Sequence, residues 1–191
     1  CFGAGMNTEI HDEQDKINPE YPEHLCLISL GSNLGNPVVN IQNAFDELKK
    51  LSSVPIRKSS LWKSAPVNCP PDSPDFINAA VAFEPLEDET PESVLSKLQQ
   101  IEIQFGRQPK TILNEPRPLD LDLIAFKNQT CRTESLTLPH PRFNQRQFVL
   151  KPLNEIVPLA ILPDQTQTIA QLLAALDTDE TLTLHSAHGR R

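Results

Sequence analysis

Two segments of the chain share a pattern that dictates where its helices begin. Asn36 and Thr90 are favourable N-cap residues, and each is followed by proline, which suits the first turn of a helix. The apolar residues that follow recur every three or four positions: Val38, Ile41, Phe45 and Leu48 in the first segment, and Val94, Leu98, Ile101 and Phe105 in the second. This spacing predicts two amphipathic helices, one over about 37–51 and one opening at Pro91.

Apolar runs of strand length precede, separate and follow these helices. They cover residues 25–30, 56–64, 76–84 and 119–126. Turn and loop residues close them, above all the proline-rich stretch 65–75. The order predicts an α+β fold of the ferredoxin-like type, β-α-β-β-α-β, with an antiparallel sheet and two helices on one face.

The chain continues beyond this core, so extra C-terminal helices or strands are expected. Residues 144–157 are predicted to be partly helical, with Pro152 interrupting the helix. Thr168 is the expected N-cap of a further short helix. The last residues, HSAHGRR, are predicted to form a tail.

Length and charge restrict the classes of function. A chain of 191 residues suits one domain, expected over 25–191, after a mobile leader over 1–24 that includes a cloning or protease-site remnant before Met6. The net charge of -8 argues against a nucleic-acid partner, and no apolar stretch is long enough to span a membrane. The four cysteines lack C-x-x-C spacing and are expected to be reduced thiols of a cytoplasmic protein.

Two aspartates lie one residue apart in the last predicted strand, LDLDLIAF. Because side chains alternate along a strand, its leucines should face the helices, and the opposite face should carry Asp120, Asp122, Ile124 and Phe126. Two carboxylates at this spacing, roughly 7 Å apart along the strand, repel each other unless a cation lies between them. The spacing supports equally a divalent-metal site, typically magnesium with phosphate, and a solvated sheet edge whose aspartates pair with arginines.

Basic residues surround this pair in the sequence. They are Arg107, Lys110 and Arg117 before it, and His140, Arg142 and Arg146 after it. Such a frame suits a polyphosphate that carries magnesium, because the cations neutralise the phosphates and the carboxylates hold the metal. The chain has no G-x-x-x-x-G-K-[ST] and no G-x-G-x-x-G motif, so any use of ATP is not that of a P-loop enzyme or a protein kinase.

Several stretches occur together in a fixed order. They are LGSNLGNP (30–37), SAPV (64–67), PDFINAAVAFE (74–84), QQIEIQFGR (99–107), PRPLDLDLIAF (116–126) and LPHPRFNQRQFVLKPLNEIVP (138–158). With these motifs, most of residues 25–163 resembles the 6-hydroxymethyl-7,8-dihydropterin pyrophosphokinase family of folate biosynthesis. The resemblance implies a ferredoxin-like fold with extra elements. It also implies transfer of the terminal pyrophosphate of ATP, the co-substrate, to the hydroxymethyl oxygen of the pterin, with release of AMP.

The resemblance further implies roles for the residues at matching positions. Asp120 and Asp122 would hold two Mg²⁺ ions on the β- and γ-phosphates, and Arg107 and Arg117 would neutralise the phosphates during transfer. Further contacts to ATP are implied for Gln99, Glu102, Lys110, Thr137, His140 and Arg146.

Contacts to the pterin are implied for Ser64, Ala65, Val67, Phe76, Asn78 and Phe148. Phe76 and Phe148 would stack on the two faces of the ring, and Asn78 would bind its edge. Without the resemblance, packing in the core would be the default expectation for both phenylalanines.

The chain also departs from the family pattern. Leu113, Asn114 and Glu115 stand where the family commonly has a basic, an aromatic and a small residue in a lid loop, Ser135 stands for an arginine, and Pro141 for a tyrosine. We expect retained chemistry with altered nucleotide binding or lid closure. The alternatives are a catalytically weak paralogue that binds pterin or nucleotide, and a ferredoxin-like interaction module. A monomer or a weak dimer is expected.

Overall fold

A computed structural model describes residues 22–66, 69–107 and 116–186. The helices are α1 (Pro37–Lys49), α2 (Pro91–Gln104), α3 (Gln147–Ile156) and α4 (Ile169–Ala175), with the short 3-10 turns η2 (Pro22–His24) and η3 (Phe143–Gln145). The strands are β1 (Cys26–Ser32), β2 (Arg57–Lys58), β3 (Leu61–Ser64), β4 (Phe76–Phe83), β5 (Asp120–Phe126), β6 (Cys131–Arg132), β7 (Thr137–Leu138) and β8 (Leu182–Ser186). The predicted leader lies outside these ranges except for η2. No helix in the described ranges is long and apolar enough to cross a membrane.

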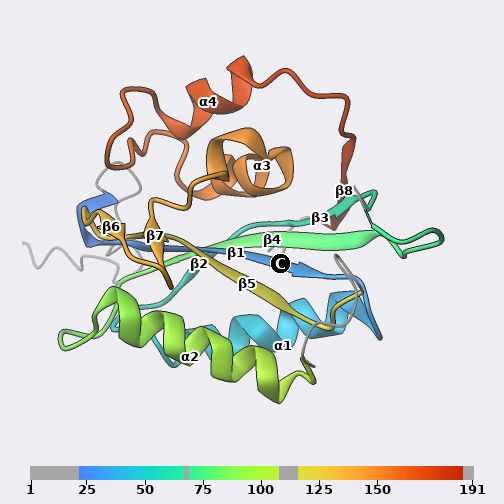
Figure 1. Ribbon diagram of the computed structural model, residues 1–191, viewed down its shortest axis with the longest axis horizontal. Helices are drawn as coiled ribbons and strands as arrows, with labels where there is room; N and C mark the ends of the chain where they lie inside the picture. The colour runs from blue at the N-terminus through green and yellow to red at the C-terminus, as the bar shows by residue number, and fades with distance from the viewer. Residues whose placement is uncertain (1–21, 67–68, 108–115, 187–191) are drawn as a thin grey trace, which may run out of the picture.

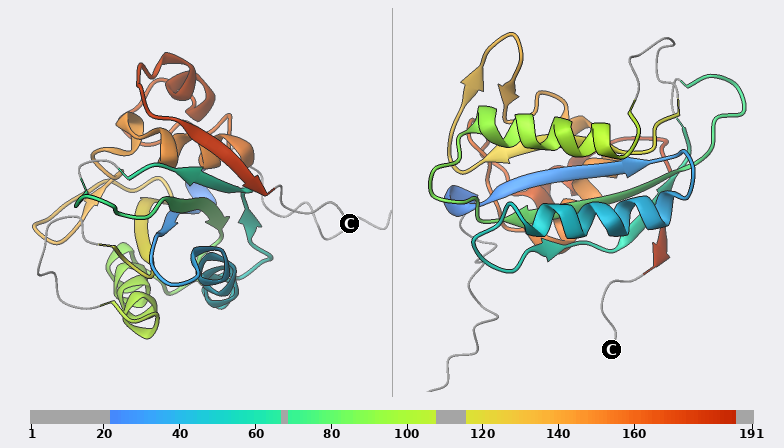
Figure 2. Two further views of the ribbon diagram at one scale, coloured as in Figure 1. Left: turned by 90° about the vertical axis from the view of Figure 1, so that its right-hand side faces the viewer. Right: turned by 90° about the horizontal axis from the view of Figure 1, so that it is seen from below.

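The main sheet is antiparallel and runs in the order β5-β1-β4-β3-β8, with β2 also paired to β4. Helices α1 and α2 lie under one face, and α3 and α4 lie over the other (Figure 1). The end-on view shows the same three layers, and the view from below shows α1 and α2 alongside each other beneath β1 (Figure 2). Strands β6 and β7 form a separate two-stranded sheet. The mixed architecture expected from the sequence is therefore present.

The predicted helix starts are confirmed by their capping bonds. The Asn36 side chain accepts the Val39 N–H at 3.3 Å, and Pro37 begins α1. Thr90 and Ser93 form a reciprocal capping box at the start of α2. Thr168 caps α4 in the same way with Gln171. These bonds satisfy N–H groups that have no partner within their helices.

Each face of the sheet has its own apolar core. The core under α1 and α2 contains alternate residues of β1, β4 and β5, among them Ile28, Val81 and Leu121. The core under α3 and α4 contains the intervening residues, such as Leu27 and Ala82. The predicted placement of the β5 leucines under the helices is confirmed.

The sheet face predicted for Phe126 was wrong, because β5 contains a bulge. Leu27 pairs with Ala125, but the next residue, Ile28, pairs with Leu123, so Ile124 is an extra residue in the ladder. Beyond the bulge the alternation reverses. Phe126 therefore packs in the core under α1 and α2, whereas Ile124 stays on the same face as the aspartates.

The strand predicted over 56–64 is divided into β2 and β3. The Ser59 N–H donates to Ala80 O at 2.9 Å, and the Ser59 hydroxyl accepts the Ala80 N–H at 2.8 Å. The next N–H, of Ser60, donates to the Glu155 carboxylate on α3. Side chains thus take over hydrogen bonds that an unbroken ladder would make.

Two further predictions for the C-terminal part were wrong. Helix α3 continues through Pro152, although proline removes one helical hydrogen bond. Burial of Val149, Leu153 and Ile156 against the sheet outweighs that loss. The predicted tail also begins within β8, which pairs with β3 in register Ser64↔Leu182.

The packing of α2 leads to a stability prediction. Leu98 is fully buried under the sheet, whereas Ile103 on the same helix is 66% exposed. Leu98→Ala is expected to lower the free energy of unfolding by about 2–5 kcal/mol. Ile103→Ala should change it by less than about 0.5 kcal/mol. Denaturant unfolding measures both, and equal effects would contradict the placement of α2.

Candidate active site

Helices α3 and α4 cover only part of the second sheet face. Over the remainder lies a cavity of about 1230 Å³. Its floor carries residues of three neighbouring strands: Ser29 and Gly31 of β1, Phe76 and Asn78 of β4, and Asp120 and Asp122 of β5. The cavity also extends around the β5 edge to α2 and across to β8.

Strand register brings the acidic pair close to Asn78. Gly31 of β1 pairs with Asp120 on one side and with Asn78 on the other. A Cβ built on Gly31 would stand 3.6 Å from the Phe76 ring and 3.7 Å from Asn78 Oδ1. The missing side chain therefore leaves the floor open between the acidic end and the aromatic end.

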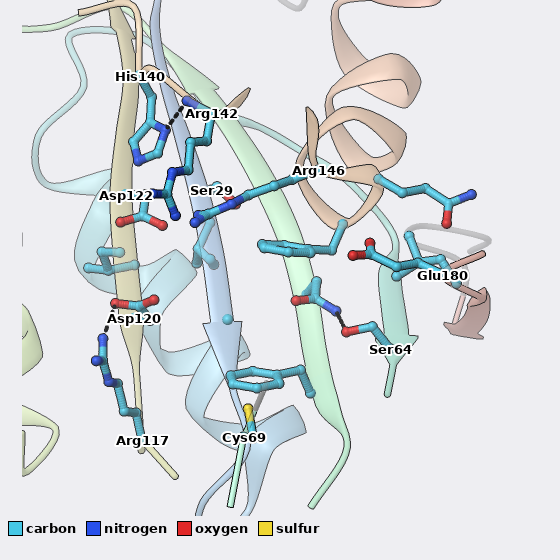
Figure 3. A pocket seen from close by; sticks show the side chains of 18 of the residues that line it. Ser29, Ser64, Cys69, Arg117, Asp120, Asp122, His140, Arg142, Arg146 and Glu180 are labelled. Atoms are coloured by element: carbon cyan, nitrogen blue, oxygen red, sulfur yellow. Dashed lines mark hydrogen bonds and ion pairs between the residues drawn. The ribbon is translucent and has the colours of Figure 1, made fainter. Parts of the chain in front are cut away.

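The two aspartates have different surroundings. Asp120 Oδ1 lies 3.3 Å from Arg117 Nη1 (Figure 3). It lies 3.6 Å from Arg107 Nη1. Asp122 makes no ion pair within the described residues at such distances. Burial and the Asp120 charge raise the pKa of Asp122 to about 7, partly offset by Arg146. The site therefore carries a carboxylate that lacks a direct cationic partner.

The end of α2 fixes Arg107 beside this pair. Gly106 adopts φ +93°, which glycine permits, and the Arg107 N–H returns to Glu102 O at 3.1 Å. The Glu102 carboxylate, almost fully buried, accepts both an Arg107 guanidinium N–H and the Leu121 N–H, the latter at 3.1 Å. Because β5 is an edge strand, this bond satisfies an otherwise free N–H. Burial raises the pKa of Glu102 to about 7.

Hydrogen bonds from Ser32 at the end of β1, Asn33 in the following turn and Asn40 in α1 hold the segment before β5. Together they form a clasp. Asn33 exchanges hydrogen bonds with the Arg117 backbone, accepting its N–H at 2.8 Å and donating its own backbone N–H at 3.1 Å. Ser32 and Asn40 both donate to Pro118 O, at 2.6 and 3.0 Å. Asn33 also donates to Pro74 O at 3.3 Å, which ties the loop before β4 to the same point.

The other end of the cavity combines aromatic rings with an amide. Asn78, 3% exposed, donates to Ser64 Oγ at 2.7 Å and to Trp62 O at 3.3 Å, so its Oδ1 remains available as an acceptor. Phe76 and Phe148 both line this part of the cavity. The Arg146 guanidinium lies 5.5 Å from the centroid of the Phe148 ring, between the aromatic end and the aspartates.

His140 stands beside the acidic pair in a defined tautomer. Its Nδ1 accepts the Arg142 N–H at 3.2 Å, so a neutral ring carries its proton on Nε2 (Figure 3). Burial and the charges of Arg146 and Arg142 lower the pKa of His140, which keeps the ring neutral near pH 7. His140 can therefore donate one hydrogen bond into the cavity.

The structure brings most of the predicted site residues into this one cavity: Ser64, Ala65, Phe76, Asn78, Gln99, Glu102, Arg107, Arg117, Asp120, Asp122, His140, Arg146 and Phe148. Thr137, predicted to contact ATP, is exposed on β7 and does not line it. Val67, Lys110 and the lid positions 113–115 lie outside the described residues.

The cavity also contains residues that were not predicted as site residues: Ser29, Gly31, Cys69, Leu95, Arg142, Gln145, Gln147, Asp179, Glu180, Thr181 and Leu182, besides Leu30 and Leu121. Arg142 was part of the basic cluster and could have been included. Asp179 and Glu180 follow no motif, and only the pairing of β8 with β3 reveals their place.

The acidic pair fits a phosphate-bound magnesium ion. In the described ranges no group of three or more His, Cys, Asp or Glu side chains could hold a metal by itself. Magnesium commonly takes one or two carboxylates and completes its shell with water and phosphate oxygens. Asp120 and Asp122 supply that number, and the cation would supply the positive charge that Asp122 lacks.

The shifted pKa of Asp122 predicts a pH dependence of stability. In the unfolded chain this carboxyl titrates near its ordinary value of about 3.9, whereas in the folded protein it titrates at about 7. The stability that depends on a protonated Asp122 is therefore fully present below pH 4 and is lost as the pH rises through 7. Asp122→Asn should flatten the fall in melting temperature between pH 5 and 8, measured with EDTA. Identical pH profiles would contradict the shift.

The clasp at Asn33 gives a second prediction. Asn33→Ala removes partners from the Arg117 N–H and from Pro74 O. It should lower the free energy of unfolding by about 1–3 kcal/mol. Asn43→Ala, an exposed position on α1, is the matched control and should change it by less than about 0.5 kcal/mol. Chemical denaturation of both variants tests the clasp, which fails if they unfold alike.

Comparison with known proteins agrees with this geometry. The sequence model of the 7,8-dihydro-6-hydroxymethylpterin-pyrophosphokinase family matches residues 27–158. A 2-amino-4-hydroxy-6-hydroxymethyldihydropteridine pyrophosphokinase of Synechocystis is 35% identical over 160 residues, 83% of this chain and 80% of that protein. The protein of the same name from Haemophilus influenzae is 37% identical over 149 residues, 78% of this chain and 90% of that protein.

Solved structures show the same fold. Wild-type HPPK-DHPS of Plasmodium falciparum with pteroate superposes with a TM-score of 0.61 at 14% identity, over 78% of this chain and 42% of that chain. The chain thus spans less than half of that protein. The family match covers more than half of the 191 residues, and the two bacterial relatives are matched over most of their length. The chain belongs to the 7,8-dihydro-6-hydroxymethylpterin-pyrophosphokinase family.

Proposed function

We propose that this protein transfers pyrophosphate from ATP to 6-hydroxymethyl-7,8-dihydropterin with the help of Mg²⁺. The hydroxymethyl oxygen forms a bond to the β-phosphorus, and the bond between that phosphorus and the bridging oxygen of the α-phosphate breaks. The products are the pterin diphosphate, AMP and the proton of the hydroxyl group. ATP and the pterin are the proposed small-molecule partners.

The observation that carries this proposal is the row Asp120–Gly31–Asn78 across three neighbouring strands. It sets a carboxylate and an amide two strand spacings apart, roughly 10 Å. A ring held at Asn78 and Phe76 would therefore present a hydroxymethyl substituent towards phosphates held at the acidic pair.

The phosphate end combines fixed cations with the acidic pair. The guanidinium groups of Arg107 and Arg117 contact Glu102 and Asp120, so their charges are in place before a ligand arrives. His140 would donate from Nε2 to a phosphate oxygen, and Arg146 would lie between phosphate and ring. Magnesium, when bound to Asp120 and Asp122, would neutralise the phosphates. Two ions are proposed.

At the ring end Asn78 Oδ1 is an available acceptor. Since both donors of this amide are used within the protein, its oxygen would accept an N–H of the pterin. Phe76 and Phe148 would stack on the ring, as an aromatic heterocycle requires. Ser64 and Ala65 would complete the rim, and Gln99 lies on the α2 side of the same cavity.

The strand order supports a more specific statement of the fold. With β2 and β3 taken as one broken strand, the order β5-β1-β4-β3 with α1 and α2 on one face is that of a ferredoxin-like sheet. We propose that α3, α4 and β8 are additions to this core within a single domain over 25–191, which acts as a monomer or weak dimer.

The catalytically weak paralogue is not favoured. The acidic pair, both arginines and the ring-binding residues share one cavity. Of the departures from the family pattern, Ser135 is exposed and does not line that cavity. An interaction module would have no need for the buried Glu102–Arg107 contact beside Asp120.

Formation of AMP tests the proposed reaction. With ATP, Mg²⁺ and 6-hydroxymethyl-7,8-dihydropterin the protein should release AMP, and without the pterin it should not. Asp120→Asn and Asp122→Asn should each lower kcat/KM at least about 100-fold, because each removes a charge aimed at the transferring group. Asp46→Asn, an exposed carboxylate on α1, is the control.

Two outcomes would reject the proposal. The first is no AMP from the wild-type protein under these conditions. The second is AMP formation that Asp120→Asn and Asp122→Asn leave unchanged, because the acidic pair would then have no part in the reaction.

A further inference from the structure

The C-terminal segment supplies one wall of the cavity. Asp179, Glu180, Thr181 and Leu182 line it, although the family match ends at residue 158. Strand β8 pairs with β3 in register Leu182↔Ser64, and Ser64 pairs in turn with Phe76. Strand pairing therefore fixes this wall directly beside the proposed ring-binding end.

Of the two charged residues in this wall, Asp179 is exposed to solvent and Glu180 is less so. It is half-buried, and Figure 3 shows its side chain pointing inwards near Ser64, on the side opposite Asp120 and Asp122. Its carboxylate makes no hydrogen bond or ion pair with the described residues. Its backbone N–H donates to Thr178 Oγ1 at 3.2 Å, which fixes the turn that carries it. The carboxylate thus remains available to a ligand.

Two side-chain amide oxygens that line the cavity accept no hydrogen bond from the described residues. Asn78 presents its Oδ1, and Gln147 has a buried Oε1 with no hydrogen-bond partner. An unpaired buried acceptor is costly, so these oxygens suit a ligand edge rich in N–H groups. The charge of Glu180 strengthens this preference, because a carboxylate accepts hydrogen bonds but donates none when ionised.

Phosphate is a poor occupant of the Glu180 end. Glu180 immediately precedes β8, which forms one margin of the sheet, whereas the acidic pair lies on β5 at the other margin, four strand spacings or roughly 19 Å from β8. The arginines lie towards the aspartates, and an unscreened carboxylate repels phosphate. The ligand group that fits Glu180 is therefore neutral or cationic and carries N–H donors.

We propose that Glu180 determines specificity for the 2-amino group of the pterin, by accepting its N–H. This inference rests on the proposed function. A 2-amino-4-oxo ring offers the amine and the neighbouring ring N–H as adjacent donors, which a carboxylate can accept side by side. A ring with a 2-oxo group in place of the amine would direct an oxygen at Glu180 and be rejected.

Substitution by glutamine tests this role, because an amide can donate to a 2-oxo group. Calorimetry would compare 6-hydroxymethyl-7,8-dihydropterin with its 2-oxo analogue, with Mg²⁺ and a non-hydrolysable ATP analogue. Glu180→Gln should weaken pterin binding about tenfold and strengthen binding of the 2-oxo analogue. Asp177→Asn, an exposed carboxylate on the same segment that does not line the cavity, should match wild type.

Three results would overturn the assignment. Unchanged affinities in Glu180→Gln would show that the carboxylate does not touch the ring. An equal loss for both ligands would show that Glu180 holds the segment in place and does not discriminate between amine and oxygen. Absence of pterin binding by the wild-type protein would reject the proposed function itself, and this assignment with it. A melting temperature close to wild type confirms that the variant is folded.

Discussion

The pairing of β1 with β4 on one side and β5 on the other is the constraint on which the rest of the site depends. It places Gly31 between Asp120 and Asn78, and Ser29 beside Asp122. Because these β1 residues are small, the floor stays low between a charged and an aromatic end. A register shift of one residue would turn the aspartates into the core under α2, where two carboxylates could not remain ionised. The same hydrogen bonds that hold the sheet together therefore also set the geometry of the cavity.

The two arginines beside the acidic pair already have partners within the protein. The Arg107 guanidinium is bound by the buried Glu102. The Arg117 backbone is bound by Asn33 and its guanidinium by Asp120, so neither arginine needs to be ordered when a polyanion binds. Asp120 is neutralised by these arginines, whereas Asp122 has a pKa raised to about 7 by burial and by its neighbour's charge. The two aspartates thus differ in their pairing. A divalent cation would stabilise the ionised form of Asp122 most, because this carboxylate lacks a cationic partner. Charges that are fixed in this way stabilise a transition state better than water does, because they need little reorganisation during the reaction.

The sequence was sufficient where local rules decide the structure. Asn36-Pro37 and Thr90-Pro91 located two helix starts, and the alternation in LDLDLIAF located the acidic face. Prediction from the sequence failed where contacts between distant segments decide the local structure. The bulge at Ile124 moved Phe126 to the other face, and burial of α3 overrode Pro152. Thr137, for which the resemblance implies a contact to ATP, is exposed on β7 and does not line the cavity, so that contact stays a prediction. The wall formed by Glu180 depends on β8 pairing with β3, and no periodicity in the last residues announces that pairing.

The distribution of charge, and not its sum, explains how an acidic chain can bind a polyphosphate. At physiological salt, exposed charges more than about 8–10 Å apart are largely screened, so the net charge of -8 acts weakly inside the cavity. There, Arg107, Arg117 and Arg146 line the end that carries the aspartates, and Glu180 lies at the far end in the wall that also contains Asp179. The proposed product, the pterin diphosphate, carries its phosphates at one end and N–H donors at the other. One orientation would set its phosphates beside the arginines, and the reverse would set them against Glu180. A carboxylate at the ring end would therefore favour the orientation that directs the hydroxymethyl substituent towards the arginines and the acidic pair, without touching the phosphates.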